Sequence, residues 1–263
     1  MSILQKIAAD TKKRITEREA LLPFSELKKK VANLDHTRDF AFEQALKSPA
    51  TDIAFICEIK RASPSKGIIA ETFPYLDIAK EYVAAGAAAI SVLTEPYYFK
   101  GDDRYLQEIA DTVKIPLLRK DFTVNPYMIY EAKLLGASAI LLICTILDTQ
   151  TLSKYITIAH SLGLSALVET HTEAEVEMAL TAGARLIGVN NRNLNTFEVD
   201  ITLSNRLRSM VPQNICFVSE SGIQTPQDID SLRKHGVDAV LIGETLMRSL
   251  DKKAALAQLG CET

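Results

Sequence analysis

Apolar runs alternate with amphipathic stretches along most of this chain. Five times a helical pattern ends in a glycine and an apolar run follows, after Gly86, Gly136, Gly163, Gly183 and Gly236. A glycine directly after a helix supplies a left-handed cap. The following runs are almost continuously apolar, which is typical of parallel strands covered on both faces. Each unit therefore predicts a helix followed by a buried strand.

Three further apolar runs complete a set of eight predicted strands, at residues 53–57, 89–93, 115–118, 139–143, 166–168, 186–189, 215–218 and 239–242. Eight strands with helical material between them favour a closed barrel over an open sheet. The predicted fold class is α/β, a (β/α)8 TIM barrel. The length of 263 residues suits one such domain, since these barrels typically contain about 250 residues.

The first 50 residues have no place in the eightfold count. Ser2 is placed to cap a first helix, and Pro23-Phe24-Ser25 begins a second helical stretch. No Gly/Ser-rich linker follows. We therefore expect residues 1–50 to be a helical extension packed on the barrel, within a single domain that covers residues 1–263.

Composition and charge narrow the class of protein. With 47% hydrophobic and 24% charged residues, the chain is an ordinary globular protein rather than a disordered one. A net charge of −3 gives no overall basic field, so we expect no nucleic acid and no membrane surface as partner. A small anionic ligand fits better. Because the sequence also lacks a signal-peptide pattern and a run of about 18 apolar residues, it predicts a cytoplasmic protein.

The cysteines and histidines show no metal-site spacing. Cys57, Cys144 and Cys216 lie within or beside apolar runs, no two cysteines form a C-x-x-C pair, and the four histidines are scattered. This pattern predicts reduced core thiols and argues against a zinc site. We expect neither a metal nor another cofactor.

Two opposite charges end the first predicted strand. Glu58 and Lys60 share a face because side chains alternate along a strand. If that face lines a barrel interior, the charges act strongly on a bound ligand, because little water screens them there. A structural ion pair that closes the strand end is the alternative, and this strand alone does not decide between them.

Polar side chains follow most other strands too. The active sites of (β/α)8 enzymes lie at the carboxyl ends of the strands. By strand parity Lys120 shares the face of Leu118, and Glu169 that of Leu167. Burying single charges at several strand ends is costly without a charged ligand or a catalytic task. The candidates at these ends are Lys120, Glu169, Asn190, Arg192, Glu220 and Ser221.

Two glycine turns indicate a place for a phosphate. Gly222 follows the seventh strand, and Gly243 with Glu244 follows the eighth. Barrel enzymes commonly bind phosphate at these two positions through backbone N–H groups and the start of a short helix. Each glycine alone is equally well explained as an ordinary turn residue.

Several separated motifs occur in a recognisable order, namely EIKRASPSKG at 58–67, ISVLTEPYYFKG at 90–101, LRKDF at 118–122, LVE at 167–169, IGVNNRNL at 187–194 and VSESGI at 218–223. Together they resemble the indole-3-glycerol phosphate synthases of tryptophan biosynthesis, over nearly the whole chain. The resemblance implies ring closure of 1-(2-carboxyphenylamino)-1-deoxyribulose 5-phosphate, a small phosphorylated substrate, with loss of CO2 and water.

The resemblance also implies a role for each candidate. Lys120 looks like the general acid, Glu169 the general base, and Glu58 a polarising or relaying neighbour. Lys60 looks like the cation that holds the substrate carboxylate. The other implied contacts are Arg192 orienting Glu58 or assisting at the carboxylate, Asn190 and Ser221 at the sugar hydroxyls, Glu220 at the substrate, Ser63, Gly222, Gly243 and Glu244 at the phosphate and its loops, and Phe99, Phe122 and Leu141 as an apolar wall.

Simpler interpretations exist for some of these residues. A Phe or Leu beside a strand belongs to the core in most proteins. The loop 63–66 is either a solvated turn or a flap that closes over the site. His171 shares a face with Glu169, but a single histidine after a strand is more often a loop or capping residue.

Two other functions compete with this one. Phosphoribosylanthranilate isomerase would share the phosphate site but needs a Cys and Asp pair, which does not stand out at the expected strand ends. A catalytically silent barrel that only binds a partner or metabolite predicts a damaged polar set, and the polar set here is complete. The chain is too short for a second barrel, so contact with other tryptophan-pathway enzymes would require association.

Overall fold

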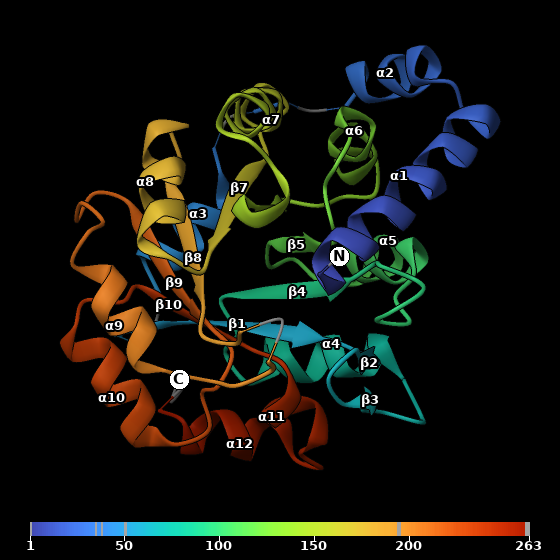
Figure 1. Ribbon diagram of the computed structural model, residues 1–263. Coiled ribbons are helices and arrows are strands. Elements are labelled where there is room, and N and C mark those ends of the chain that lie inside the picture. The colour runs from blue at the N-terminus through green and yellow to red at the C-terminus, as the bar shows by residue number, and fades with distance from the viewer. Residues whose placement is uncertain (1, 35, 38, 50–51, 194–195, 261–263) are drawn as a thin grey trace.

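Eight parallel strands form a closed barrel in the computed structural model, which describes residues 2–34, 36–37, 39–49, 52–193 and 196–260. The order around the barrel is β1-β10-β9-β8-β7-β6-β5-β4 (Figure 1). The strands are β1 (Ala54–Ile59), β4 (Ala89–Leu93), β5 (Leu117–Lys120), β6 (Ala139–Ile143), β7 (Ser165–Thr170), β8 (Leu186–Asn190), β9 (Cys216–Glu220) and β10 (Ala239–Ile242). The predicted fold and all eight strands are confirmed.

Several strand boundaries differ from the prediction by one or two residues, and one of these shifts has a clear cause. The third barrel strand begins at Leu117, not at residue 115. Pro116 has no N–H to donate to a neighbouring strand, although its carbonyl accepts from the N–H of Ile90. A short hairpin of β2 (Ala62–Ser63) and β3 (Gly67–Ile68) follows β1.

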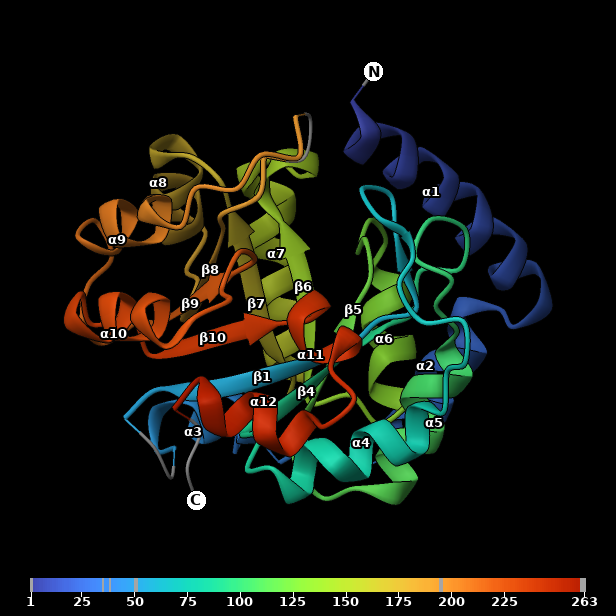
Figure 2. The same ribbon diagram turned by 90° about the horizontal axis from the view of Figure 1, so that it is seen from below.

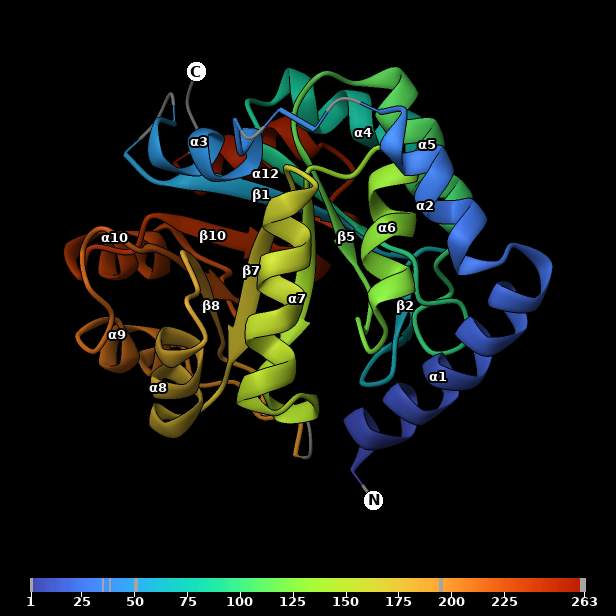
Figure 3. The ribbon, with the colours of Figure 1, turned by 90° about the horizontal axis from the view of Figure 1, so that it is seen from above.

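Helices cover the outside of the barrel, as Figure 3 shows from above. They are α4 (Tyr75–Ala84), α5 (Asp103–Thr112), α6 (Pro126–Leu134), α7 (Thr149–Ser161), α8 (Glu173–Thr181), α9 (Thr202–Arg208), α10 (Pro226–Lys234), α11 (Glu244–Arg248) and α12 (Lys252–Gln258), with a 3₁₀ turn at Cys144–Ile146. Leu194 and Cys261, which the sequence motifs and cysteine count include, lie outside the described residues.

Strand parity separates two apolar cores. One core lies between strands and helices and includes Phe55, Ile140 and Val240. The other fills the barrel interior and includes Leu118 and Leu167, the parity partners of Lys120 and Glu169. The interior face predicted for these two charged residues is therefore confirmed. Cys57, Cys144 and Cys216 are buried, and none of them forms a disulfide within the described part of the chain.

The N-terminal segment forms three helices packed on the barrel, α1 (Ile3–Leu21), α2 (Phe24–Ala32) and α3 (Ala41–Lys47). Ser2 caps α1 in a capping box with Gln5, and α2 starts where Pro23 predicted it. Helix α3 was not predicted; its Phe42 and Leu46 join the interior core against β1, β4, β7 and β9. In Figure 2 the start of α1 and the β2–β3 hairpin lie on the side to which the strands point.

Candidate functional site

A cavity of about 380 Å³ opens at the carboxyl ends of the barrel strands. Its volume falls within the range of about 300–1,000 Å³ that is usual for small-molecule sites. Every residue that the sequence assigned to the site lines it: Glu58, Lys60, Ser63, Phe99, Lys120, Phe122, Leu141, Glu169, Asn190, Arg192, Glu220, Ser221, Gly222, Gly243 and Glu244. The fold thus gathers candidates that lie as far apart in sequence as residues 58 and 244.

Lys120 lies at the centre of a buried charge cluster. Its Nζ donates a hydrogen bond to Glu220 Oε2 at 3.0 Å and lies 3.7 Å from Glu58 Oε1 and 3.9 Å from Glu169 Oε2. Lys60 forms an ion pair with the other oxygen of Glu58. Because β1, β5, β7 and β9 all end here, four separate strands supply the cluster.

The pKa values in this cluster are strongly shifted. Burial disfavours the Lys120 ammonium, but Glu220, Glu58 and Glu169 outweigh that effect and raise the pKa of Lys120 well above its ordinary value. Burial likewise opposes the Glu58 carboxylate, yet Lys60 and Lys120 lower its pKa. For Glu220 burial prevails and raises the pKa to about 7. Shifts of this kind at a strand-end cavity are typical of catalytic sites.

Two glycines make room for these carboxylates. A Cβ on Gly243 would collide with the carboxylate of Glu58 and lie 2.9 Å from Lys60 Nζ. A Cβ on Gly188 would collide with Glu220 Oε1. The sequence assigned Gly243 to phosphate binding alone, and the structure adds this steric role beside the Glu58–Lys60 pair.

Arg192 contacts a different carboxylate from the one suggested for it. Its guanidinium lies 3.8 Å from Glu244 Oε2 and donates to the carbonyl of Phe197 at 3.3 Å. The sequence offered Glu58 as one partner, but no contact between Arg192 and Glu58 is found in the described part of the chain. Glu244 also lies 3.6 Å from Lys66 Nζ and 3.2 Å from Arg248 Nε. The Glu244 carboxylate therefore lies close to three cationic side chains, which come from three different segments.

The remaining polar candidates occupy loops at the rim. The backbone N–H of Arg192 donates to Asn190 Oδ1 at 3.0 Å, which turns the chain after β8. Ser221 and Gly222 both have positive φ values, 68° and 86°. The backbone of this turn is therefore left-handed and changes direction after β9. The Ser63 hydroxyl lies 3.4 Å from that of Ser65 within the β2–β3 hairpin.

The cavity has an apolar side that the sequence predicted only in part. The rings of Phe99 and Phe122 lie 6.1 Å apart, and Leu141 lines the same cavity. Leu4 and Ile7 of α1 join them there. The N-terminal extension therefore forms part of the site, a role that its helical periodicity did not reveal.

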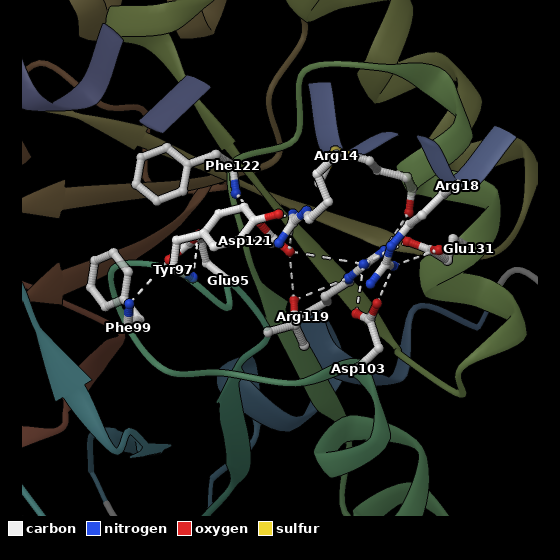
Figure 4. A network of polar contacts seen from close by, with 12 residues as sticks. Arg14, Arg18, Glu95, Tyr97, Phe99, Asp103, Arg119, Asp121, Phe122 and Glu131 are labelled. Atoms are coloured by element: carbon white, nitrogen blue, oxygen red, sulfur yellow. Dashed lines mark hydrogen bonds and ion pairs between the residues drawn. The ribbon is translucent and has the colours of Figure 1, made fainter. Parts of the chain in front are cut away.

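Asp121, beside Lys120 in the chain, anchors α1 to β5. Both of its oxygens accept from Arg14 Nη2 at 2.8 Å, and Oδ2 also accepts from the Thr94 hydroxyl. Figure 4 shows this contact next to Arg119, whose Nη2 reaches Asp103 at 2.7 Å and Glu131 at 2.6 Å. The LRKDF motif contains Asp121, but the position of Arg14 on a remote helix gave no sequence signal for the pairing.

His171 is the other residue whose place the sequence did not foresee. Its Nε2 lies 3.4 Å from Glu169 Oε1, and its Nδ1 lies 3.3 Å from Glu175 Oε2. The sequence did indicate that His171 lies on the same strand face as Glu169. Because single histidines after a strand are more often loop or capping residues, it did not predict a role for His171 at the site.

The described residues form neither a metal-ligand cluster nor a membrane-spanning helix. No group of three or more His, Cys, Asp or Glu side chains is arranged to hold a metal ion there. No helix of that part of the chain is both long and apolar enough to cross a membrane.

Comparison with known proteins gives a consistent result. A family model described as indole-3-glycerol phosphate synthase matches residues 4–259. The indole-3-glycerol phosphate synthase of Ruminiclostridium cellulolyticum is 61% identical over 98% of both chains, and that of Lachnoclostridium phytofermentans is 51% identical over 98% of both. A solved 3-hexulose-6-phosphate synthase shares only the fold, with a TM-score of 0.61, 13% identity and coverage of 80% of this chain and 100% of that one.

Proposed function

Because this chain belongs to the indole-3-glycerol phosphate synthase family, we propose that the charge cluster around Lys120 is its catalytic centre. The chain is a decarboxylating lyase of tryptophan biosynthesis. It closes the indole ring of 1-(2-carboxyphenylamino)-1-deoxyribulose 5-phosphate with loss of CO2 and water. The observation that carries the proposal is one ammonium within 3.9 Å of three buried carboxylates inside the cavity.

Lys120 acts as the general acid of ring closure. The substrate ketone oxygen gains a proton as the aromatic carbon that bears the carboxylate attacks the ketone carbon. A raised pKa keeps the proton on Lys120 until the developing alkoxide, a far stronger base, lies beside it. A positioned acid of this kind contributes about 10²–10⁴-fold to a rate.

Glu169 acts as the general base of the later step. After CO2 leaves, the new ring loses a proton and expels the hydroxyl group as water. Glu169 Oε2 and Glu58 Oε1 flank Lys120 Nζ, so proton donor and acceptors face the same volume. Glu58 relays protons or polarises the substrate beside them, and its low pKa keeps it ionised. Asn190 holds a sugar hydroxyl together with Ser221 and Glu220.

Lys60 holds the substrate carboxylate before it leaves as CO2. Its ammonium lines the cavity on β1's end and pairs with Glu58 in the absence of that carboxylate. Arg192 assists from the loop after β8. The apolar side, formed by Phe99, Phe122 and Leu141, holds the aromatic ring and keeps water from the reacting carbon.

The phosphate binds to backbone N–H groups at Gly222, Gly243 and Glu244, with Ser63 closing from the hairpin. This placement is supported by the two turns after β9 and β10 and by Lys66, Arg192 and Arg248, which neutralise the Glu244 carboxylate there. Without those cations the carboxylate would repel a phosphate.

We further propose that residues 1–263 form one domain that acts in the cytoplasm without a metal or other cofactor. Three buried cysteines that form no disulfide among the described residues support a reducing compartment. Contact with other tryptophan-pathway enzymes would occur by association of separate chains.

The direct test is indole fluorescence after mixing purified, EDTA-treated protein with 1-(2-carboxyphenylamino)-1-deoxyribulose 5-phosphate. We expect a saturable rise that does not depend on added metal. If folded protein gave no signal, the isomerase or silent-barrel alternative would replace the proposal. A rise in melting temperature with the same substrate would then show whether the cavity is occupied.

A further inference from the structure

We propose that His171 is a positioning residue that, together with Glu175, holds Glu169 in its catalytic orientation. This inference rests on the proposed role of Glu169 as the base. It starts from a row of three groups, because the imidazole of His171 lies between the carboxylates of Glu169 and Glu175, 3.4 Å from one and 3.3 Å from the other.

The two oxygens of Glu169 have different neighbours. Oε2 faces Lys120 Nζ at 3.9 Å, whereas Oε1 faces His171 Nε2. Nε2 is shielded from solvent and makes no hydrogen bond among the described residues, and the Glu169 carboxylate lies 3.4 Å from it. A carboxylate held at one oxygen presents the other to the substrate, and this restriction is what a general base needs.

Glu175 is itself firmly placed, which makes it a suitable support. Its Oε2 accepts from the backbone N–H of His171 at 2.6 Å, and its Oε1 accepts from the Thr145 hydroxyl at 2.7 Å. Its own N–H donates to Thr172, the cap of α8. Through His171 and Glu175, the segments after β6 and β7 and the start of α8 are therefore linked to one oxygen of Glu169.

The charge of the imidazole fits this role. Burial favours the neutral ring, but Glu175, Glu169 and Glu220 together outweigh that effect and raise the pKa of His171. Two carboxylates on opposite sides are best satisfied by a ring that carries a proton on each nitrogen. The Thr145 hydroxyl, 3.4 Å from Nδ1, is the neutral group beside it.

The test is a double-mutant cycle that measures kcat and KM separately. We expect His171→Ala to lower kcat by about 10- to 100-fold with KM nearly unchanged, since misplacing a catalytic group by about 1 Å can cost about 10²-fold. In a Glu169→Gln background the same change should have almost no further effect. Glu175→Gln should lower kcat less than His171→Ala, and Glu177→Gln, exposed on the same helix, should leave kcat unchanged.

The outcomes separate this inference from the role of Glu169. If Glu169→Gln lowers kcat but His171→Ala stays within twofold of the parent protein, His171 does not position the base and the inference is wrong. An undiminished effect of His171→Ala in the Glu169→Gln background would overturn it as well. A normal kcat for Glu169→Gln would instead remove Glu169 as the base, and the inference with it. If His171→Ala does not fold, Glu175→Gln replaces it in the cycle. A loss of kcat that disappears in the Glu169→Gln background would then support the inference, and an unchanged kcat would overturn it.

Discussion

Strand β5 separates two buried charge networks that differ in kind. On its outer side Arg119 belongs to a network of three arginines and three carboxylates, formed by Arg14, Arg18, Arg119, Asp103, Asp121 and Glu131. On its inner side Lys120 belongs to a cluster in which two lysines face three carboxylates. With every group ionised, the outer charges balance, and the inner ones leave a net negative charge.

Arg119 and Glu220, one from each network, differ in hydrogen bonding. Each guanidinium nitrogen of Arg119 has an acceptor, among them Thr94 at 3.2 Å and the Met128 carbonyl at 3.0 Å. In the inner cluster Glu220 Oε1 is buried and has no hydrogen-bond partner in the described part of the chain. The outer network is not fully saturated either, because Arg14 Nε is buried without a hydrogen-bond partner among the described residues. A neutral network stabilises a fold, whereas a cluster with unbalanced charge and an unpaired carboxylate oxygen retains capacity to bind and move protons. Charge balance, rather than complete hydrogen bonding, therefore separates the outer structural network from the inner catalytic cluster.

The largest expected effect is on stability and lies on the outer side. Arg119→Met leaves Asp103 and Glu131 with one cation fewer in a buried place. Removing one partner of such a pair costs about 3–5 kcal/mol, so the free energy of unfolding should fall by that amount. Urea denaturation measures it, with the exposed Arg104→Met as control, expected within about 1 kcal/mol of the parent protein. A change below 1 kcal/mol for Arg119→Met would show that the outer network does not stabilise the fold.

The next effect is on turnover and lies on the inner side. Lys120→Ala removes the proposed acid and should lower kcat by about a hundredfold or more, while the folded structure persists. Steady-state indole fluorescence measures kcat, and circular dichroism checks the fold. Lys114→Ala, on the exposed side of the segment before β5, should keep normal kcat. A near-normal rate for Lys120→Ala would remove Lys120 as the acid and the contrast between the two networks.

The smallest effect concerns pH and the excess negative charge of the inner cluster. Burial raises the pKa of Glu220 from 4.5 to about 7, so the folded protein binds a proton that the unfolded chain releases. The contribution of this group to the free energy of unfolding therefore falls as pH rises from about 4.5 to about 7. Glu220→Gln abolishes that loss, so its melting temperature relative to the parent protein should rise between about pH 5 and pH 8.

Scanning calorimetry at several pH values measures this difference. Glu173→Gln, an exposed change at the start of α8, should show no such trend. If the difference in melting temperature between Glu220→Gln and the parent protein stays constant across the pH range, the Glu220 carboxyl has an ordinary pKa. The inner cluster would then be fully ionised and would hold no extra proton.

The sequence by itself determined the barrel, its eight strands and the interior faces of Lys120 and Glu169. Glycine caps, apolar runs and alternation along a strand are local signals, and they act over a few residues. The sequence also placed every site candidate at the cavity, because the carboxyl ends of parallel strands meet at one end of a barrel. The boundary at Leu117 was missed by two residues, and helix α3 was missed altogether.

Only the tertiary structure decided which side chains pair. Arg192 approaches Glu244 rather than Glu58, Arg14 reaches Asp121 across 107 residues, and His171 lies between two carboxylates. Alternation along a strand predicts which face of the strand a side chain occupies. Which charged group that side chain pairs with depends on distances between segments that are remote in sequence. Those distances are set by how the barrel closes and where α1 packs, and for buried charges a difference of an ångström or two changes the energy of a pair and the pKa values that follow from it.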